Sequence, residues 1–318
     1  MLKSWLRRVR WRRVVIGAAL LLVLLSGYGV YVGWRLTHLP RMKLPTTPAF
    51  WGMKYRKVRF LSAVDHLRLH GWFIPAAHKT ALTVVFSHGY GSNRADIGIP
   101  GLLMMRAVHL WGANILTFDY RAEGRSPGDL VSVGEFEVRD LVGAVEAVRT
   151  TFAPKTKVAI VGFSMGASIA LMAGEADPHV AAVVADSPFA ALLPYLQHNL
   201  PVWTNLPAFP FDWIILTLTP PITGVNPALV DPLAHLAKLG HRPVLLIAGK
   251  ADKTVPDANS KLLYARLRRT DPNASLWLVP GAHHVESFQL RPLQYLARLY
   301  AVLHGVDPQL KAPPAFGL

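Results

Sequence analysis

The chain has 318 residues, no cysteine, and 34 Lys and Arg against 19 Asp and Glu, a net charge of +15. The length suits one domain of about 250 residues with an appendage. Without cysteine, disulfides, cysteine-based zinc sites and thiol catalysis are excluded. Thirteen of the basic residues lie in residues 1–59, which contain no acidic residue. The rest of the chain is nearly neutral, which argues against a nucleic-acid-binding domain.

The N-terminal segment has the pattern of a membrane anchor. Residues 1–13 form a basic tail with six Lys or Arg, and residues 14–34 carry no charge. A helix of that length spans about 30 Å, the thickness of the bilayer hydrocarbon. The charge bias predicts a single-pass topology with a cytoplasmic N-terminus and the following domain on the extracytoplasmic side. A cleaved signal peptide is the alternative, although residues 26–31 offer no clear cleavage site. The proline-containing residues 35–55 are interpreted as a tether.

From residue 56 to residue 305, strand and helix patterns alternate, which predicts an α/β fold with a doubly wound, mostly parallel sheet. The first two strands, 57–61 and 67–74, alternate like an antiparallel hairpin. An insertion rich in Pro, Trp, Phe and Leu occupies residues 187–235, and a lid and an ordinary helical subdomain are both open interpretations. Residues 306–318 are assigned to a C-terminal tail. Further strands are predicted at 82–87, 113–118, 157–162, 180–185, 243–248 and 275–279, and helices at about 95–110, 134–152, 165–175, 256–268 and 286–304.

The sequence Gly162-Phe163-Ser164-Met165-Gly166 fits the pattern G-x-S-x-G. It lies between a β-branched strand pattern and a helical pattern. A serine on such a sharp turn projects its Oγ outward, and glycines on either side let the chain pass close to its neighbours. We therefore predict that Ser164 is a nucleophile, which needs a base held by a third group.

Two later strands end at side chains that could assist this serine. Asp252 follows the strand at 243–248, and His283 and His284 follow the strand at 275–279. The ends of parallel strands meet at one edge of a sheet, where open α/β folds place their sites. Asp186, after the strand at 180–185, is a second candidate acid. Asp252 could also be a simple turn residue, since Asp is common in turns.

With these motifs, the chain resembles the serine hydrolases of the α/β-hydrolase superfamily, in particular those with a short membrane anchor before the catalytic domain. The resemblance covers about residues 55–305, and the family has the chain order Ser, Asp or Glu, His. It assigns the acid to Asp252 rather than Asp186, and the base to His284. His283 stands where the family usually has glycine, so His283 remains an alternative base. The resemblance rests on His88–Gly91, Asp119–Ser126, the Ser164 turn, Gly249–Asp252 and Gly281–His284.

The same resemblance implies how the reaction's oxyanion would be held. The backbone N–H groups of Tyr90 and Met165 occupy the positions that donate to the oxyanion in the family. His88 is interpreted as a residue that braces the loop rather than as a base. Arg121 and Glu123 are interpreted as a structural pair.

The sequence therefore predicts a membrane-anchored serine hydrolase that cleaves an ester or thioester of a hydrophobic or acyl substrate. Ser164, His284 and Asp252 would form and hydrolyse an acyl-enzyme with no metal or organic cofactor. The expected partners are a small-molecule or lipid-like ester and the membrane. An acyltransferase or peptidase with the same triad and a catalytically silent, membrane-tethered binding protein stay open. The sequence indicates no oligomeric state.

Overall fold

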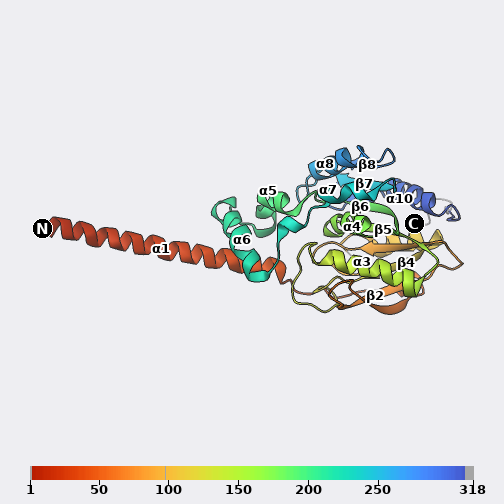
Figure 1. The fold of residues 1–318 in the computed structure, drawn as a ribbon, viewed down its shortest axis with the longest axis horizontal. Coiled ribbons are helices and arrows are strands. Elements are labelled where there is room, and N and C mark those ends of the chain that lie inside the picture. The colour runs from red at the N-terminus through yellow and green to blue at the C-terminus, as the bar shows by residue number, and fades with distance from the viewer. Residues whose placement is uncertain (1, 97, 312–318) are drawn as a thin grey trace.

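The computed structural model describes residues 2–96 and 98–311 (Figure 1). Its centre is an eight-stranded sheet in the order β1-β2-β4-β3-β5-β6-β7-β8. The β1–β2 and β2–β4 pairs are antiparallel, and every later pair is parallel. This confirms the predicted mostly parallel sheet and its opening hairpin. The strands are β1 Arg56–Leu61, β2 Arg68–Ile74, β3 Leu82–Ser87, β4 Asn114–Phe118, β5 Lys157–Phe163, β6 Val180–Asp186, β7 Val244–Gly249 and β8 Ser275–Val279.

Helices cover both faces of the sheet, as the predicted doubly wound fold requires. One core lies between the sheet and α3 (Glu137–Ala147), α4 (Met165–Ala176) and α8 (Ala258–Leu267). The other lies between the sheet and α2 (Gly101–Leu110), α9 (Ser287–Leu290) and α10 (Pro292–Val306). The central strands β3, β5 and β7 are buried on both faces, which explains their continuous apolar sequences.

Three predicted helices differ in their bounds, each for a local reason. The helix expected at 95–110 begins only at Gly101, after Pro100. The helix expected at 286–304 is divided at Arg291, because proline at 292 disfavours helical geometry at the preceding residue. The helix expected at 134–152 is α3 followed by a π-helical turn, Val148–Phe152. Of the expected C-terminal tail, residues 312–318 lie outside the described residues.

The insertion between β6 and β7 is helical. It contains α5 (Leu192–Thr204), α6 (Ala208–Thr223), a short turn Pro227–Leu229, α7 (Pro232–His235) and a 3₁₀ turn Leu236–Leu239. Figure 1 shows α5 and α6 at the end of the domain from which the N-terminal helix extends.

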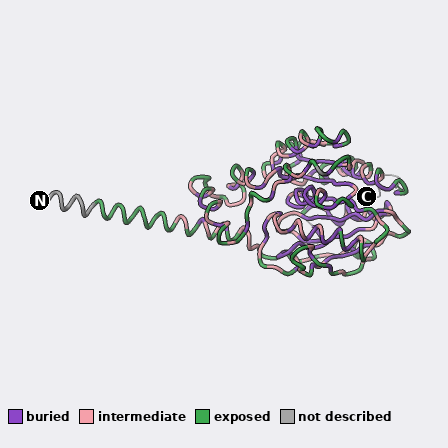
Figure 2. The backbone as a smooth tube through the Cα atoms, viewed as in Figure 1, coloured by how far each residue is buried: buried purple, intermediate pink, exposed green. Residues whose placement is uncertain are grey.

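The N-terminal helix α1 (Leu2–Thr37) projects from the domain as a long rod (Figures 1 and 2). Its portion Trp11–Thr37 contains an 18-residue window with a mean hydropathy of 2.2. This portion is long and apolar enough to cross a membrane, although a signal sequence would have the same length and composition. Residues 11–24 are exposed, whereas Leu25, Val32 and Leu36 pack against the domain. After α1 the chain continues without helix or strand to a 3₁₀ turn at Pro48–Trp51.

Candidate active site

Ser164 lies on a tight turn between β5 and α4, with φ 53° and ψ −119°. A positive φ is uncommon for residues other than glycine and persists only where the surrounding structure enforces it. A Cβ on Gly162 would lie 2.3 Å from the Gly166 carbonyl oxygen, and a Cβ on Gly166 would lie 2.2 Å from the Ser87 carbonyl oxygen. Both glycines of the motif are therefore required by close backbone packing, which holds the serine outward.

His284 connects Ser164 to Asp252 by hydrogen bonds. Its Nε2 lies 2.8 Å from Ser164 Oγ, and its Nδ1 lies 2.7 Å from Asp252 Oδ2. The other Asp252 oxygen accepts the backbone N–H groups of Thr254 and Val255, each at 2.8 Å. The buried carboxylate therefore favours a proton on Nδ1, which leaves Nε2 free to accept the serine proton. The structure thus brings the three predicted side chains together.

The two alternatives from the sequence occupy other positions. His283 is exposed, and its Nδ1 lies 3.1 Å from the Ala251 carbonyl oxygen rather than near Ser164. Asp186 is buried and accepts the Ser187 hydroxyl at 3.0 Å. Burial raises the pKa of Asp186 to about 7. Its backbone carbonyl accepts the Ser164 N–H at 2.8 Å, so Asp186 supports the serine turn and does not orient His284.

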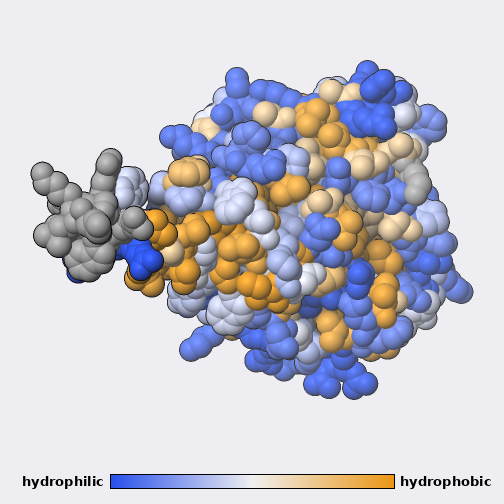
Figure 3. All heavy atoms as spheres, turned by 60° about the vertical axis from the view of Figure 1, so that its left-hand side comes forward, coloured by the Kyte–Doolittle hydropathy of each residue, from blue (hydrophilic) through white to orange (hydrophobic). Residues whose placement is uncertain are grey.

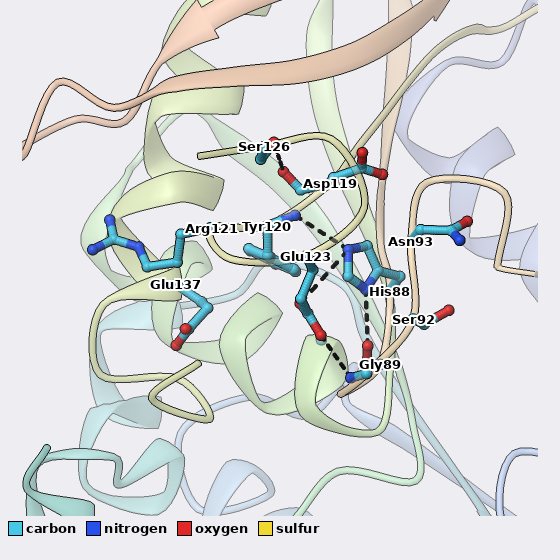
Figure 4. Close-up of polar contacts among 12 residues, drawn as sticks. His88, Gly89, Ser92, Asn93, Asp119, Tyr120, Arg121, Glu123, Ser126 and Glu137 are labelled. Carbon is cyan, nitrogen blue, oxygen red and sulfur yellow. Dashed lines mark hydrogen bonds and ion pairs between the residues drawn. The ribbon is translucent and has the colours of Figure 1, made fainter. Parts of the chain in front are cut away.

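Buried polar groups hold the loop that follows β3 (Figure 4). The Tyr120 N–H donates to His88 Nε2 at 3.2 Å, so His88 carries its proton on Nδ1 and donates it to the Gly89 carbonyl at 2.8 Å. Burial lowers the pKa of His88, which keeps the imidazole neutral. Glu123 Oε1 accepts the Gly91 N–H at 2.6 Å. Residues on both sides of Tyr90 are therefore fixed, as the bracing role for His88 implies.

The same loop passes directly beside the serine. A Cβ on Gly89 would lie 3.5 Å from Ser164 Cβ. Met165, the second expected oxyanion donor, is the first residue of α4. Both backbone segments that the resemblance implies thus adjoin Ser164.

Comparison with known proteins identifies the family of this chain. A model described as "Alpha/beta hydrolase family" matches residues 84–299, a range that contains Ser164, Asp252 and His284. The chain belongs to the alpha/beta hydrolase family. It is 30% identical over 218 residues to the uncharacterized protein YqkD of Bacillus subtilis (strain 168), covering 67% of this chain and 68% of that protein. It is 23% identical over 287 residues to the alpha/beta hydrolase domain-containing protein WAV2 of Arabidopsis thaliana, covering 86% of each.

A solved structure extends the comparison to a protein described as an esterase. The Pyrococcus furiosus esterase Pf2001 superposes with a TM-score of 0.72 at 27% identity, covering 86% of this chain and 98% of that chain. The family match and this similarity together support a hydrolase and confirm the α/β-hydrolase fold.

The expected pairing of Arg121 with Glu123 is wrong, although neither lies in the Ser164 hydrogen-bond chain. Arg121 binds Asp140 at 2.6 Å and Asp65 at 2.5 Å. Glu123 instead holds the loop at Gly91, and burial raises its pKa well above the usual value. The partners of Arg121 come from distant parts of the sequence, so no local pattern could indicate them.

Ser164 opens into an apolar pocket of about 860 Å³, open solvent at its mouth included. Among the described residues, none that lines it is charged. The walls come from α5 and α6 of the insertion, from the loop at Tyr90 and from the end of α1. The lining includes Gly33, Leu36, Thr37, Tyr90, Ser132, Val133, Ser164, Met165, Phe189, Leu192, Tyr195, Leu196, Leu200, Trp203, Ile215, Leu216, Thr219, Pro220, Thr223, Val225, Pro227 and Val255.

The contribution of α1 to this pocket was not predicted from the sequence. The available signal was the spacing Gly29-Val30-Tyr31-Val32-Gly33, a pair of small residues one turn apart on an apolar helix. Within the described residues, no group of three or more His, Cys, Asp or Glu side chains is arranged to hold a metal ion.

Proposed function

We propose that this hydrolase cleaves an ester or thioester of a hydrophobic acyl group through a serine acyl-enzyme. The observation that carries the proposal is the continuous hydrogen-bond chain from Ser164 Oγ through His284 to Asp252, at 2.8 and 2.7 Å, at an uncharged pocket. Such a chain gives a serine hydroxyl the base that it otherwise lacks.

In the first half of the reaction, Ser164 Oγ attacks the carbonyl carbon while His284 Nε2 takes its proton. The carbonyl electron pair moves onto oxygen, where the N–H groups of Tyr90 and Met165 stabilise the oxyanion. When the tetrahedral intermediate collapses, the bond to the leaving alcohol or thiol breaks and His284 gives it the proton. Asp252 orients the imidazole and stabilises its cationic form.

In the second half, water hydrolyses the acyl-enzyme by the same route. His284 takes a proton from water as the water oxygen attacks the acyl carbon. Collapse releases the carboxylic acid, and the proton on His284 returns to Ser164 Oγ. The bonds and protons balance without a metal or an organic cofactor.

The pocket supports an acyl group as the bound part of the substrate. Its lining is uncharged and mostly aliphatic or aromatic, so a charged substrate portion would lose hydration there without a partner. An alkyl chain would gain about 0.8 kcal/mol for each buried CH₂.

We also propose that α1 is an uncleaved anchor with the N-terminus in the cytoplasm and the hydrolase domain on the opposite side. The last turns of α1 support this, because they are part of the folded domain. The Tyr90 hydroxyl donates to the Leu36 carbonyl, and the Val131 N–H donates to the Thr37 carbonyl at 2.8 Å. Leu25, which precedes the possible cleavage site, also packs against the cluster of Leu200, Phe211 and Ile215, and cleavage at residues 27–33 would remove this contact.

The reaction is tested with the full-length chain in nonionic detergent and p-nitrophenyl esters of increasing acyl length. Ser164→Ala and His284→Ala should each lower kcat by about 10⁴-fold or more. His283→Ala is the matched control and should stay within about threefold of the parent, because its side chain faces away from the serine. If His283→Ala is the damaging variant, the base is wrongly assigned. If no ester is cleaved but acyl transfer or peptide cleavage is found, the substrate class is wrong.

A further inference from the structure

The end of α1 and helix α6 pack together closely enough to act as one unit. A Cβ on Gly29 would lie 2.5 Å from Ile214 Cγ2, and a Cβ on Gly33 would lie 2.1 Å from Thr219 Oγ1. The two glycines are one helical turn apart, so they form a smooth strip along which α6 approaches the α1 backbone. This is the way in which small residues bring helices together in membranes.

The position of this contact along α1 determines how deep α6 would lie in the membrane. The uncharged segment of residues 14–34 has its midpoint at Leu24. Contacts with the insertion begin at Leu25 and continue through Val32 to Leu36. If residues 14–34 cross the hydrocarbon, then α6 lies beside the half of the span that is nearer to the hydrolase domain.

The exposed residues of α6 are of the kind that this depth requires. Phe209, Trp213 and Ile222 are 86%, 64% and 60% exposed. Asp212 is the only charged residue of α6, and it is partly buried. Large apolar side chains that are exposed on one helix are unfavourable in water, whereas the hydrocarbon of a membrane accepts them. Figure 3 shows hydrophobic surface continuing from α1 onto the adjoining part of the domain.

The same two helices form a wall of the pocket that contains Ser164. Gly33 and Leu36 of α1 line it, as do Ile215 and Thr219 of α6. The pocket is thus bounded by α1 and α6, the two helices that would lie in the membrane. An acyl chain in the adjacent leaflet would reach this wall without crossing water.

We propose that α6 is immersed in the membrane leaflet on the domain side, packed against α1, and that the pocket between them takes the acyl chain of a membrane-resident ester directly from that leaflet. The proposal rests on ester hydrolysis at Ser164 and on α1 as an uncleaved anchor. It makes α1 part of the substrate site as well as the anchor.

The depth of α6 is tested without any measurement of catalysis. Because the chain has no cysteine, single cysteines can be introduced into the full-length protein at Trp213, at Leu22 in the exposed part of α1, and at Leu262 on α8. Each is labelled with an environment-sensitive NBD fluorophore, and the protein is reconstituted into phosphatidylcholine vesicles with or without doxyl-labelled lipid. Leu262 is a matched control because it is also an exposed apolar residue, on another helix.

Labels at positions 22 and 213 should show blue-shifted emission and strong quenching by doxyl lipid, and the label at 262 should show neither. Quenching at 22 with none at 213 would overturn the proposal and leave the anchor and the Ser164 chemistry intact. If the label at position 22 is not quenched either, α1 is not in the membrane, and the proposal fails because it rests on α1 as an anchor.

The route of the substrate is tested with Trp213→Glu and the control Leu262→Glu. Trp213 does not line the pocket, so the hydrolysis of a soluble short-chain p-nitrophenyl ester should stay within about twofold of the parent in both variants. Hydrolysis of a long-chain fluorogenic ester dissolved in vesicles should fall about tenfold or more in Trp213→Glu alone, because a carboxylate resists immersion. If Trp213→Glu loses activity equally on both esters, or loses none on either, uptake of the substrate from the leaflet is contradicted. If the parent cleaves neither ester, the proposed function fails, while the quenching result still locates α6.

Discussion

Asp186 gives the clearest quantitative prediction, because its buried carboxyl changes how stability depends on pH. The side chain is 1% exposed, and burial raises its pKa from 3.8 to about 7. The folded state therefore retains a proton that the unfolded chain has already lost. Stability should fall as pH rises from about 4 to about 7 and then level off, since the folded state binds more protons over this range.

The shift of about three pH units corresponds to about 4 kcal/mol, at about 1.4 kcal/mol per unit. Asp186→Asn removes this titration while keeping an acceptor for the Ser187 hydroxyl, which Asp186 accepts at 3.0 Å. Between pH 4 and pH 8, the free energy of unfolding of the variant relative to the parent should increase by up to about 4 kcal/mol. Taking the difference between the two proteins cancels the other titrating groups they share.

The assay is guanidinium unfolding of the full-length chain in nonionic detergent, followed by tryptophan fluorescence at a series of pH values. Hydrolysis of a short-chain ester shows that the variant is folded, because the Ser164 N–H bonds to the backbone of Asp186 and not to its side chain. If the stability curves of variant and parent are parallel, or if the variant gains stability only at acid pH, the pKa of Asp186 is not raised in the folded protein.

Two further predictions follow from close packing and from charge. Gly166→Ala should fail to accumulate as folded protein, because its Cβ would lie 2.2 Å from the Ser87 carbonyl oxygen, and the yield of folded protein relative to the parent checks this. Gly305→Ala is the control: Gly305 has open space around it in α10, so this variant should keep the stability of the parent or gain up to about 1 kcal/mol in thermal unfolding. The proposed topology predicts that added protease digests the hydrolase domain from the extracytoplasmic side and that the purified membrane form begins at or near Met1. A soluble form beginning near residues 27–33 would show a cleaved signal peptide, and protection of the domain until lysis would show the reverse orientation.

The parts of this molecule that the sequence predicts well are those encoded locally. The strand bounds follow from short apolar and β-branched segments, and Ser164, Asp252 and His284 each follow the end of such a segment. The choice between His284 and His283 is less local, because it depends on the turn that begins at Gly281, where φ is 78°. His283 and His284 have the same side chain, and only the backbone conformation of this turn decides which of the two imidazoles points toward Ser164.

The parts that the sequence does not predict are contacts between distant residues. The apolar pattern of α1 indicates a membrane span, but its packing against Ile214 and Thr219 depends on an insertion far along the chain. The partners of Arg121 are also distant in sequence. Because such contacts depend on how the elements assemble, the composition predicts the apolar span and the apolar insertion but not the pocket wall that α1 and α6 share.

The most direct measurement of the central claim is the location of a covalent adduct. Full-length protein is treated with a fluorophosphonate, digested and sequenced by mass spectrometry. Ser132 also lines the pocket, but its hydroxyl donates to Glu137 and is not bonded to a histidine, so it is an internal control. We expect one adduct, on Ser164, which is lost in His284→Ala and retained in His283→Ala. An adduct on Ser132, or labelling that persists in Ser164→Ala, would contradict it.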